Sequence, residues 1–168
     1  MNGNLSTSAQ LVQDALAELE FSLEVIELPD STRTAVEAAQ AIGCQVGQIV
    51  KSLIFKSKRS QRPILVLASG PNRVDERKIE SLIGEPLGNA NAEFVRQETG
   101  FAIGGVPPVG HRNKLATYID EDLLLFENVW AAAGTPFAVF QIQSSDLAKI
   151  TTGQVVDVKK TESSAQAG

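Results

Sequence analysis

Residues 48–57 form the most regular stretch of the chain: Gln48-Ile49-Val50-Lys51-Ser52-Leu53-Ile54-Phe55-Lys56-Ser57. They fit the two-residue period of a β-strand, in which odd-numbered and even-numbered residues occupy opposite faces. The odd-numbered face is large and apolar except for Lys51, so we expect this to be the one buried face of the strand, with Lys51 on it. An unpaired ammonium is costly to bury, so Lys51 must have a partner, snorkel to solvent or line a pocket. A charge that breaks an apolar pattern points to a functional site.

A second strand is expected shortly afterwards. A basic turn at residues 58–62 leads to Pro63 and then to the continuous apolar run Ile64-Leu65-Val66-Leu67-Ala68. Such a run is typical of a central strand that is buried on both faces.

The flanking sequence alternates irregularly between short helical and short extended patterns. We expect helices near residues 8–19, 35–42, 75–83, 92–99 and 146–150, and further strands near 22–28, 115–119, 137–142 and 155–158. This mixture predicts one α/β (α+β) domain over residues 8–160, with a mixed, mostly antiparallel sheet flanked by short helices. Residues 1–7 and 161–168 are expected to be flexible tails.

Composition narrows the class of protein. The chain has 168 residues and a net charge of −5, which argues against a protein that coats long nucleic acids but allows contact with a few phosphates. One cysteine, Cys44, and one histidine, His111, cannot supply an ordinary zinc site. No apolar run is long enough to span a bilayer and the N-terminus does not resemble a signal peptide. We therefore expect a cytoplasmic protein with no membrane association, no metal and no cofactor.

A glycine- and proline-rich segment stands out at residues 100–111: Gly100-Phe101-Ala102-Ile103-Gly104-Gly105-Val106-Pro107-Pro108-Val109-Gly110-His111. It is too rich in these residues to be a helix or strand and too apolar to be a solvated linker. Glycine allows a ligand to approach the backbone closely, and proline stiffens the chain. The segment is either a rigid loop whose N–H groups face an oxyanion or carbonyl, or a tight turn between buried strands.

The residues before the expected helix at 35–42 also carry two interpretations. Thr32 and Thr34 precede the helix N-terminus, and Thr34 with Glu37 has the spacing of a capping box. Free N–H groups at such a terminus can hold an anion. The alternative is that the hydroxyls only cap the helix.

Several common catalytic schemes are excluded by the motifs they need. The sequence has no nucleotide-binding glycine motif, no dinucleotide fingerprint and no Gly-x-Ser-x-Gly elbow. A lysine on an apolar strand face, a backbone-rich loop, hydroxyls near a helix start and Asp120 remain. This set can hydrolyse an activated ester, with the loop holding the carbonyl, the lysine supplying positive charge and water acting as the nucleophile. His111 beside the loop either touches a substrate or has a surface or capping role.

Four segments occur in the order seen in one known family. They are Thr34-Ala35 with Ala38-Ala39 before Gly43, then Ile49 to Phe55, then Gly104-Gly105-Val106-Pro107-Pro108-Val109-Gly110, and then Gly134-Thr135-Pro136. Over roughly residues 8–160 the chain resembles the YbaK/ProX family of free-standing aminoacyl-tRNA deacylases. That family is similar to the editing (insertion) domain of bacterial prolyl-tRNA synthetase.

The resemblance implies a trans-editing hydrolase that cleaves the ester between a wrong amino acid and the 3′ end of a tRNA. It assigns catalytic roles to Lys51, Gly104, Gly105 and Pro108. The candidate substrate-binding residues are Thr32, Thr34, Phe55, His111, Asp120 and Gly134. The family varies after the loop, so His111 is not matched to a shared function.

The expected substrates carry a small amino acid such as Ala, Ser, Thr or Cys on tRNA-Pro or a related tRNA. A synthetase separates side chains that differ by one methylene only by about 10–200-fold, so a second hydrolytic site has a purpose. Lys51 acts either as an ammonium or, with a lowered pKa, as a base, and we favour the ammonium. We expect a monomer that meets the aminoacyl-tRNA end and possible synthetase partners. The alternative is a module that binds such ends, or a synthetase, without hydrolysis.

Overall fold

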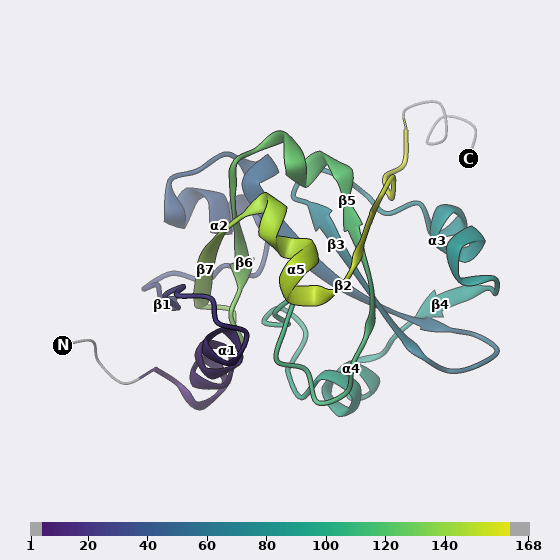
Figure 1. Ribbon diagram of the computed structural model, residues 1–168, viewed down its shortest axis with the longest axis horizontal. Coiled ribbons are helices and arrows are strands. Elements are labelled where there is room, and N and C mark those ends of the chain that lie inside the picture. The colour runs from purple at the N-terminus through teal and green to yellow at the C-terminus, as the bar shows by residue number, and fades with distance from the viewer. Residues whose placement is uncertain (1–4, 162–168) are drawn as a thin grey trace.

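A computed structural model describes residues 5–161, which form one mixed sheet with short helices around it (Figure 1). The strands follow the order β1-β7-β6-β2-β3-β5-β8, and β4 pairs with β2 outside that path. The strands are β1 (Ile26–Glu27), β2 (Ile49–Ser57), β3 (Pro63–Ser69), β4 (Leu87–Asn89), β5 (Ala116–Asp120), β6 (Asn128–Ala132), β7 (Ala138–Gln143) and β8 (Gln154–Val156). The α-helices are α1 (Thr7–Glu18), α2 (Ala35–Ile42), α3 (Glu76–Ile83), α4 (Ala92–Thr99) and α5 (Leu147–Thr151).

The predicted α+β class and mixed sheet are confirmed. Strand β2 runs antiparallel to β3, and Lys51 lies opposite Ala68. The pairs β1–β7, β2–β4 and β6–β7 are also antiparallel. The pairs β2–β6, β3–β5 and β5–β8 are parallel. Antiparallel pairing is therefore the majority by a narrow margin among the described strands.

Strand β2 differs from expectation because both of its faces are covered. Val50 and Ile54 pack in the main core on one face, whereas Leu53 and Phe55 pack against a second cluster on the other. The expectation of a single buried face is therefore wrong. Strand β3 behaves as predicted: residues 64–68 are fully buried.

The sheet opens beside β2. Strand β6 pairs with β2 only at Ile49 and Val50, and β4 pairs with the same edge only from Phe55 onward. Within residues 5–161, no strand covers this edge between those two pairings. Backbone groups alternate along a strand, and the N–H of Ser57 bonds to Arg62 on the β3 side. The peptide groups of Ser52 and Ile54 are therefore directed at the opening.

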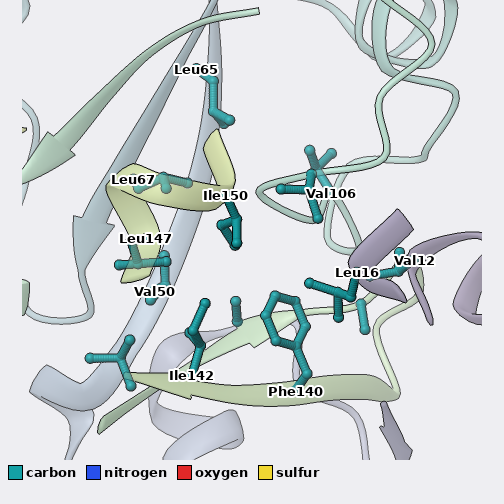
Figure 2. Close-up of a cluster of buried hydrophobic side chains, with 14 of the residues drawn as sticks. Val12, Leu16, Val50, Leu65, Leu67, Val106, Phe140, Ile142, Leu147 and Ile150 are labelled. Atoms are coloured by element: carbon teal, nitrogen blue, oxygen red, sulfur yellow. The ribbon is translucent and has the colours of Figure 1, made fainter. Parts of the chain in front are cut away.

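The main core fills one side of the sheet and reaches the glycine-rich loop. Phe140 and Ile142 from β7 are buried together with Leu16 of α1, as Figure 2 shows. Val106 and Val109 of the loop are buried in the same cluster. The loop is thus anchored by apolar side chains, which explains why it is apolar without being a strand.

The helix ends are set by capping side chains and by glycine. Thr34 and Glu37 form the expected capping box of α2, and Gly43 ends that helix with a φ of 86°. Helix α1 begins at Thr7, one residue before the expected start at residue 8, and Ser6 caps it by accepting a hydrogen bond from the N–H of Ala9. Leu5 packs against the main core, so ordered structure starts before residue 8. The rest of the expected tails, residues 1–4 and 162–168, lies outside the described residues.

Three strands differ from the sequence-based expectation. The strand expected at residues 22–28 is reduced to Ile26–Glu27 at the sheet edge. No strand was expected at Leu87–Asn89, which forms β4 and pairs with the end of β2, or at Asn128–Ala132, which forms β6. Within the described part of the chain, each helix is too short or too polar to cross a bilayer.

Candidate active site

A cavity of about 460 Å³ lies where β2 and β6 separate. Strand β2 forms one wall, the segment before α2 forms another, and the glycine-rich loop forms a third. The lining residues are Thr32, Arg33, Thr34, Ala35, Val36, Ile49, Val50, Lys51, Ser52, Leu53, Gly70, Ile103, Gly104, Val106 and Ala132. Of the ten site residues expected from the sequence, Lys51, Gly104, Thr32 and Thr34 line this cavity.

Lys51 is half-buried in the wall of the cavity. Its Nζ donates a hydrogen bond to the backbone carbonyl of Asn72 at 2.5 Å. Burial lowers the pKa of Lys51, the negative charge of Asp120 opposes this shift, and the positive charge of Arg73 adds to it. The ammonium thus has a neutral partner, so its charge is not cancelled by a directly bonded carboxylate.

Asp120 does not line the cavity but lies close enough to Lys51 to act on its charge. It is fully buried, and its Oδ2 accepts hydrogen bonds from the N–H of Ser69 at 2.9 Å and the side chain of Asn72 at 2.8 Å. Its Oδ1 accepts from the N–H of Asp122 at 2.9 Å. These contacts make Asp120 the anchor of the turn that holds Asn72, and its place in substrate binding stays a prediction.

The two adjacent glycines of the loop have different environments. Gly104 lines the cavity with a φ of 95°, and a Cβ there would make only ordinary contacts. Gly105 is buried, donates its N–H to Ala102 at 3.1 Å and accepts from the N–H of Gly134 at 2.9 Å. Gly105 therefore fixes the loop to the turn at residues 134–136, and Gly104 is the glycine presented to a ligand.

The threonines before α2 use their hydroxyls for structure. Thr32 donates both its N–H and its hydroxyl to the carbonyl of Pro136. Thr34 accepts from the N–H of Glu37 at 3.1 Å as the helix cap. The capping interpretation therefore accounts for Thr34, while Thr32 ties this wall to the same turn that holds Gly105.

Six of the ten expected site residues are absent from the lining of the Lys51 cavity: Gly105, Asp120 and Gly134, and also Pro108, His111 and Phe55. Pro108 and His111 line a separate hollow of about 210 Å³. His111 bonds through Nε2 to the carbonyl of Pro107 at 2.6 Å and meets the ring of Phe101 edge-on. Burial lowers the pKa of His111, and the bond to Pro107 acts in the opposite direction. Phe55 packs against the second hydrophobic cluster instead.

Sequence reasoning missed three residues near Lys51. Arg33 lines the cavity between the two threonines, where its position alone could have suggested it. Ile103 is 59% exposed at the cavity, and its neighbour Gly104 was the available signal. Asn72, which bonds Lys51 through its carbonyl, carries no sequence signal because any residue has that group.

The arrangement can hold and polarise an electrophile. A half-buried ammonium, a glycine backbone and the uncovered edge of β2 surround one space. Within residues 5–161, no three His, Cys, Asp or Glu side chains cluster closely enough to hold a metal ion. Polar backbone groups of this kind suit charge that develops on a carbonyl oxygen.

A family model described as "Aminoacyl-tRNA editing domain" matches residues 29–150. The chain belongs to this family. The matched residues include Lys51, Gly104 and the turn at 134–136, and the predicted class of aminoacyl-tRNA deacylase is thereby confirmed at family level. An editing domain acts on aminoacyl-tRNA, which confirms the coarse expectation about its partner.

Known proteins similar to this editing domain include both free-standing chains and parts of larger enzymes. YwhH of Bacillus subtilis, an uncharacterized protein, is 30% identical over 82% of this chain and 87% of its own length. Proline–tRNA ligase of Limosilactobacillus fermentum is 32% identical over 54% of this chain, which corresponds to 16% of the ligase. EbsC of Enterococcus faecalis, named as a proposed Cys-tRNA(Pro)/Cys-tRNA(Cys) deacylase, is 22% identical over 77% of this chain and 79% of its own.

The fold of the editing domain is also similar to solved structures. One is described as a proposed trans-editing enzyme for prolyl tRNA synthetase; it is 53% identical, with a TM-score of 0.89, over 94% of this chain and all of the other. A second, a hypothetical protein named APE2540, is 27% identical with a TM-score of 0.83 over 89% of this chain and 99% of its own.

Proposed function

We propose that this editing domain hydrolyses the ester bond of tRNA mischarged with a small amino acid, with water as the nucleophile. The observation that carries the proposal is the cavity between β2 and β6. It brings the ammonium of Lys51, the backbone of Gly104 and the uncovered edge of β2 around one space. Each of these groups suits an ester carbonyl whose oxygen becomes negative during attack.

The cavity has the size expected for an aminoacyl end. Its volume of about 460 Å³ lies within the roughly 300–1,000 Å³ of ligand pockets. Leu53 and Val106 supply apolar wall, which favours a short aliphatic, hydroxyl or thiol side chain. Discrimination by size is the task that editing performs, because one methylene separates substrates only by about 10–200-fold in a synthetase pocket.

The reaction needs positioning and charge rather than a protein nucleophile. Water adds to the carbonyl carbon, and negative charge develops on the carbonyl oxygen. The ammonium of Lys51 stabilises that charge, together with N–H groups of the loop or the β2 edge. When the ester C–O bond breaks, the ribose oxygen leaves and takes a proton that originates from the water. The products are a free amino acid and an uncharged tRNA end.

Recognition of the tRNA is proposed to involve a few phosphates near the 3′ end. Arg33 lies at the cavity and is exposed, so it can meet the terminal nucleotides despite the net charge of −5. Such binding weakens as salt rises. The proline–tRNA ligases and the deacylase EbsC among the relatives support tRNA-Pro, or a tRNA related to it, as the carrier.

The test is deacylation of a panel of mischarged tRNAs by wild type, Lys51→Ala and Lys51→Arg. We expect wild type to cleave one or a few small aminoacyl-tRNAs and Lys51→Ala to lose at least about 10²–10³-fold in kcat. Lys51→Arg keeps the charge and some binding but not the geometry. Lys56→Ala is the matched control, because Lys56 is on the same strand but faces Phe94, outside the cavity lining.

Two results would overturn the proposal. The first is equal turnover by wild type and Lys51→Ala, which would remove Lys51 from the reaction. The second is binding of charged tRNA ends without cleavage of any member of the panel, which would favour a non-catalytic binding module.

A further inference from the structure

A chain of hydrogen bonds connects the cavity with the C-terminal segment of the described chain. Lys51 donates to the carbonyl of Asn72. The side-chain amide of Asn72 donates to Asp120 at 2.8 Å and to Asp122 at 2.9 Å. Lys159 donates to the same Oδ2 of Asp122 at 2.5 Å. Asn72 and Asp122 thus link Lys51 with a lysine 108 positions later in the sequence.

The geometry leaves Asn72 little freedom. Both hydrogens of its amide are used, one on each carboxylate, and its N–H donates to the carbonyl of Ser69 at 2.9 Å. Together these bonds restrain the turn whose backbone carbonyl, that of Asn72, accepts the hydrogen bond from Lys51. Without this acceptor, the flexible side chain of Lys51, which has four rotatable bonds, would sample many positions.

The segment that carries Lys159 is held in place by its backbone. The N–H of Asp75 donates to Val158 at 2.7 Å, and the N–H of Lys160 donates to Arg73 at 2.8 Å. Val158 is fully buried. Figure 1 shows this last part of the chain continuing from β8, which pairs with β5. Lys159 lies beyond residues 29–150, so the family match does not include it.

We propose that Asn72 and Lys159 are positioning residues that hold the ammonium of Lys51 at the cavity. The inference rests on the proposed function, because it takes Lys51 as the group that acts on the ester. Asn72 sets the place of Nζ, and Lys159 balances the charge of Asp122. Without Lys159, the carboxylate of Asp122 would lose its ion-pair partner, so it would hold the amide of Asn72 less firmly and the ammonium of Lys51 would lose its fixed position.

The experiment measures kcat, KM and the thermal midpoint for four variants on the best substrate of the panel. Asn72→Ala should lower kcat by about 10²-fold, because a misplacement of about 1 Å costs that much. Lys159→Met should lower kcat by about 10-fold, with KM within about twofold of wild type. Lys159→Arg should restore wild-type kcat, since it keeps the charge and a donor. Lys160→Met is the matched control, because its side chain is exposed on the same segment.

The outcomes separate this inference from the proposed function. Lys159→Met with wild-type kcat, in an enzyme that Lys51→Ala inactivates, overturns the inference and leaves the function intact. A wild type without turnover overturns the function itself. A Lys159→Met variant that loses kcat but is not rescued by Lys159→Arg also overturns the inference, since the charge would then not matter. Lys159 is partly exposed, so this variant remains informative if Asn72→Ala fails to fold.

Discussion

Gly105→Ala is expected to disturb the reaction through backbone packing. A Cβ at Gly105 would lie 2.7 Å from the Cα of Thr135 and 2.8 Å from its nitrogen, where ordinary contact begins at 3.4 Å. Because both partners are backbone, the loop must shift by about 0.7 Å, and overpacking of this kind costs about 1–3 kcal/mol. Gly104 directly precedes Gly105 in the chain and lines the cavity. A shift of this size should lower kcat by about 10- to 100-fold.

The assay is deacylation under single-turnover conditions, together with urea unfolding of the same variant. Gly84→Ala is the matched control: Gly84 ends α3 with a φ of 79°, and nothing lies within 4 Å of its added Cβ. That control should lose about 1–2 kcal/mol from backbone strain and keep its kcat. A Gly105→Ala variant with wild-type kcat and wild-type stability would refute the idea that the loop takes its geometry from the turn at 134–136.

Two further predictions concern ionisation. Burial lowers the pKa of Lys51 below that of an ordinary lysine. If Lys51 acts as an ammonium, the enzymatic rate, corrected for spontaneous ester hydrolysis, should fall as pH rises through this pKa. A rate that rises as Lys51 loses its proton would instead assign Lys51 as a base. Glu85 accepts hydrogen bonds from the N–H groups of Arg59 and Ser60 and from the hydroxyl of Ser60, which lower its pKa to about 2. The ionised Glu85 therefore stabilises the fold fully above the pKa that glutamate has in the unfolded chain, and this stabilisation is lost as pH falls toward 2. Glu85→Gln should unfold at a lower urea concentration than wild type at pH 7, and its stability should depend less on acid pH. An identical urea midpoint for the two proteins at pH 7 would contradict this.

Much of the fold was predictable because local signals and burial agreed. Continuous apolarity identified β3, and the capping box of Thr34 with Gly43 bounded α2 at both ends. The faces of β2 were misread because alternation alone does not reveal that both sides of a sheet are covered. β1 and β4 are short edge or side strands whose pairing depends on partners far away in sequence, so local patterns did not define them.

The candidate site was predictable at positions where a residue type does not fit the surrounding secondary-structure pattern. Lys51 interrupts an apolar strand face, and the glycine-rich loop has no ordinary secondary structure; the structure brings them to one cavity. Pro108 and His111 lie in the same loop sequence, yet the loop turns and places them at another hollow. Sequence proximity did not reveal this turn. The carbonyl of Asn72 was likewise hidden, because its role depends on backbone direction rather than residue type.

The short pairing between β6 and β2 has a consequence for how such proteins diversify. Because β6 leaves β2 after Val50, the polar groups directed at the opening from Ser52 and Ile54 belong to the main chain. Substitutions at wall positions such as Leu53, Ile103 or Val106 can then change the shape of the space and leave those polar groups in place. If the proposed reaction depends on Lys51 and on these main-chain groups, substitutions of the wall side chains can change substrate preference while the reaction chemistry is kept.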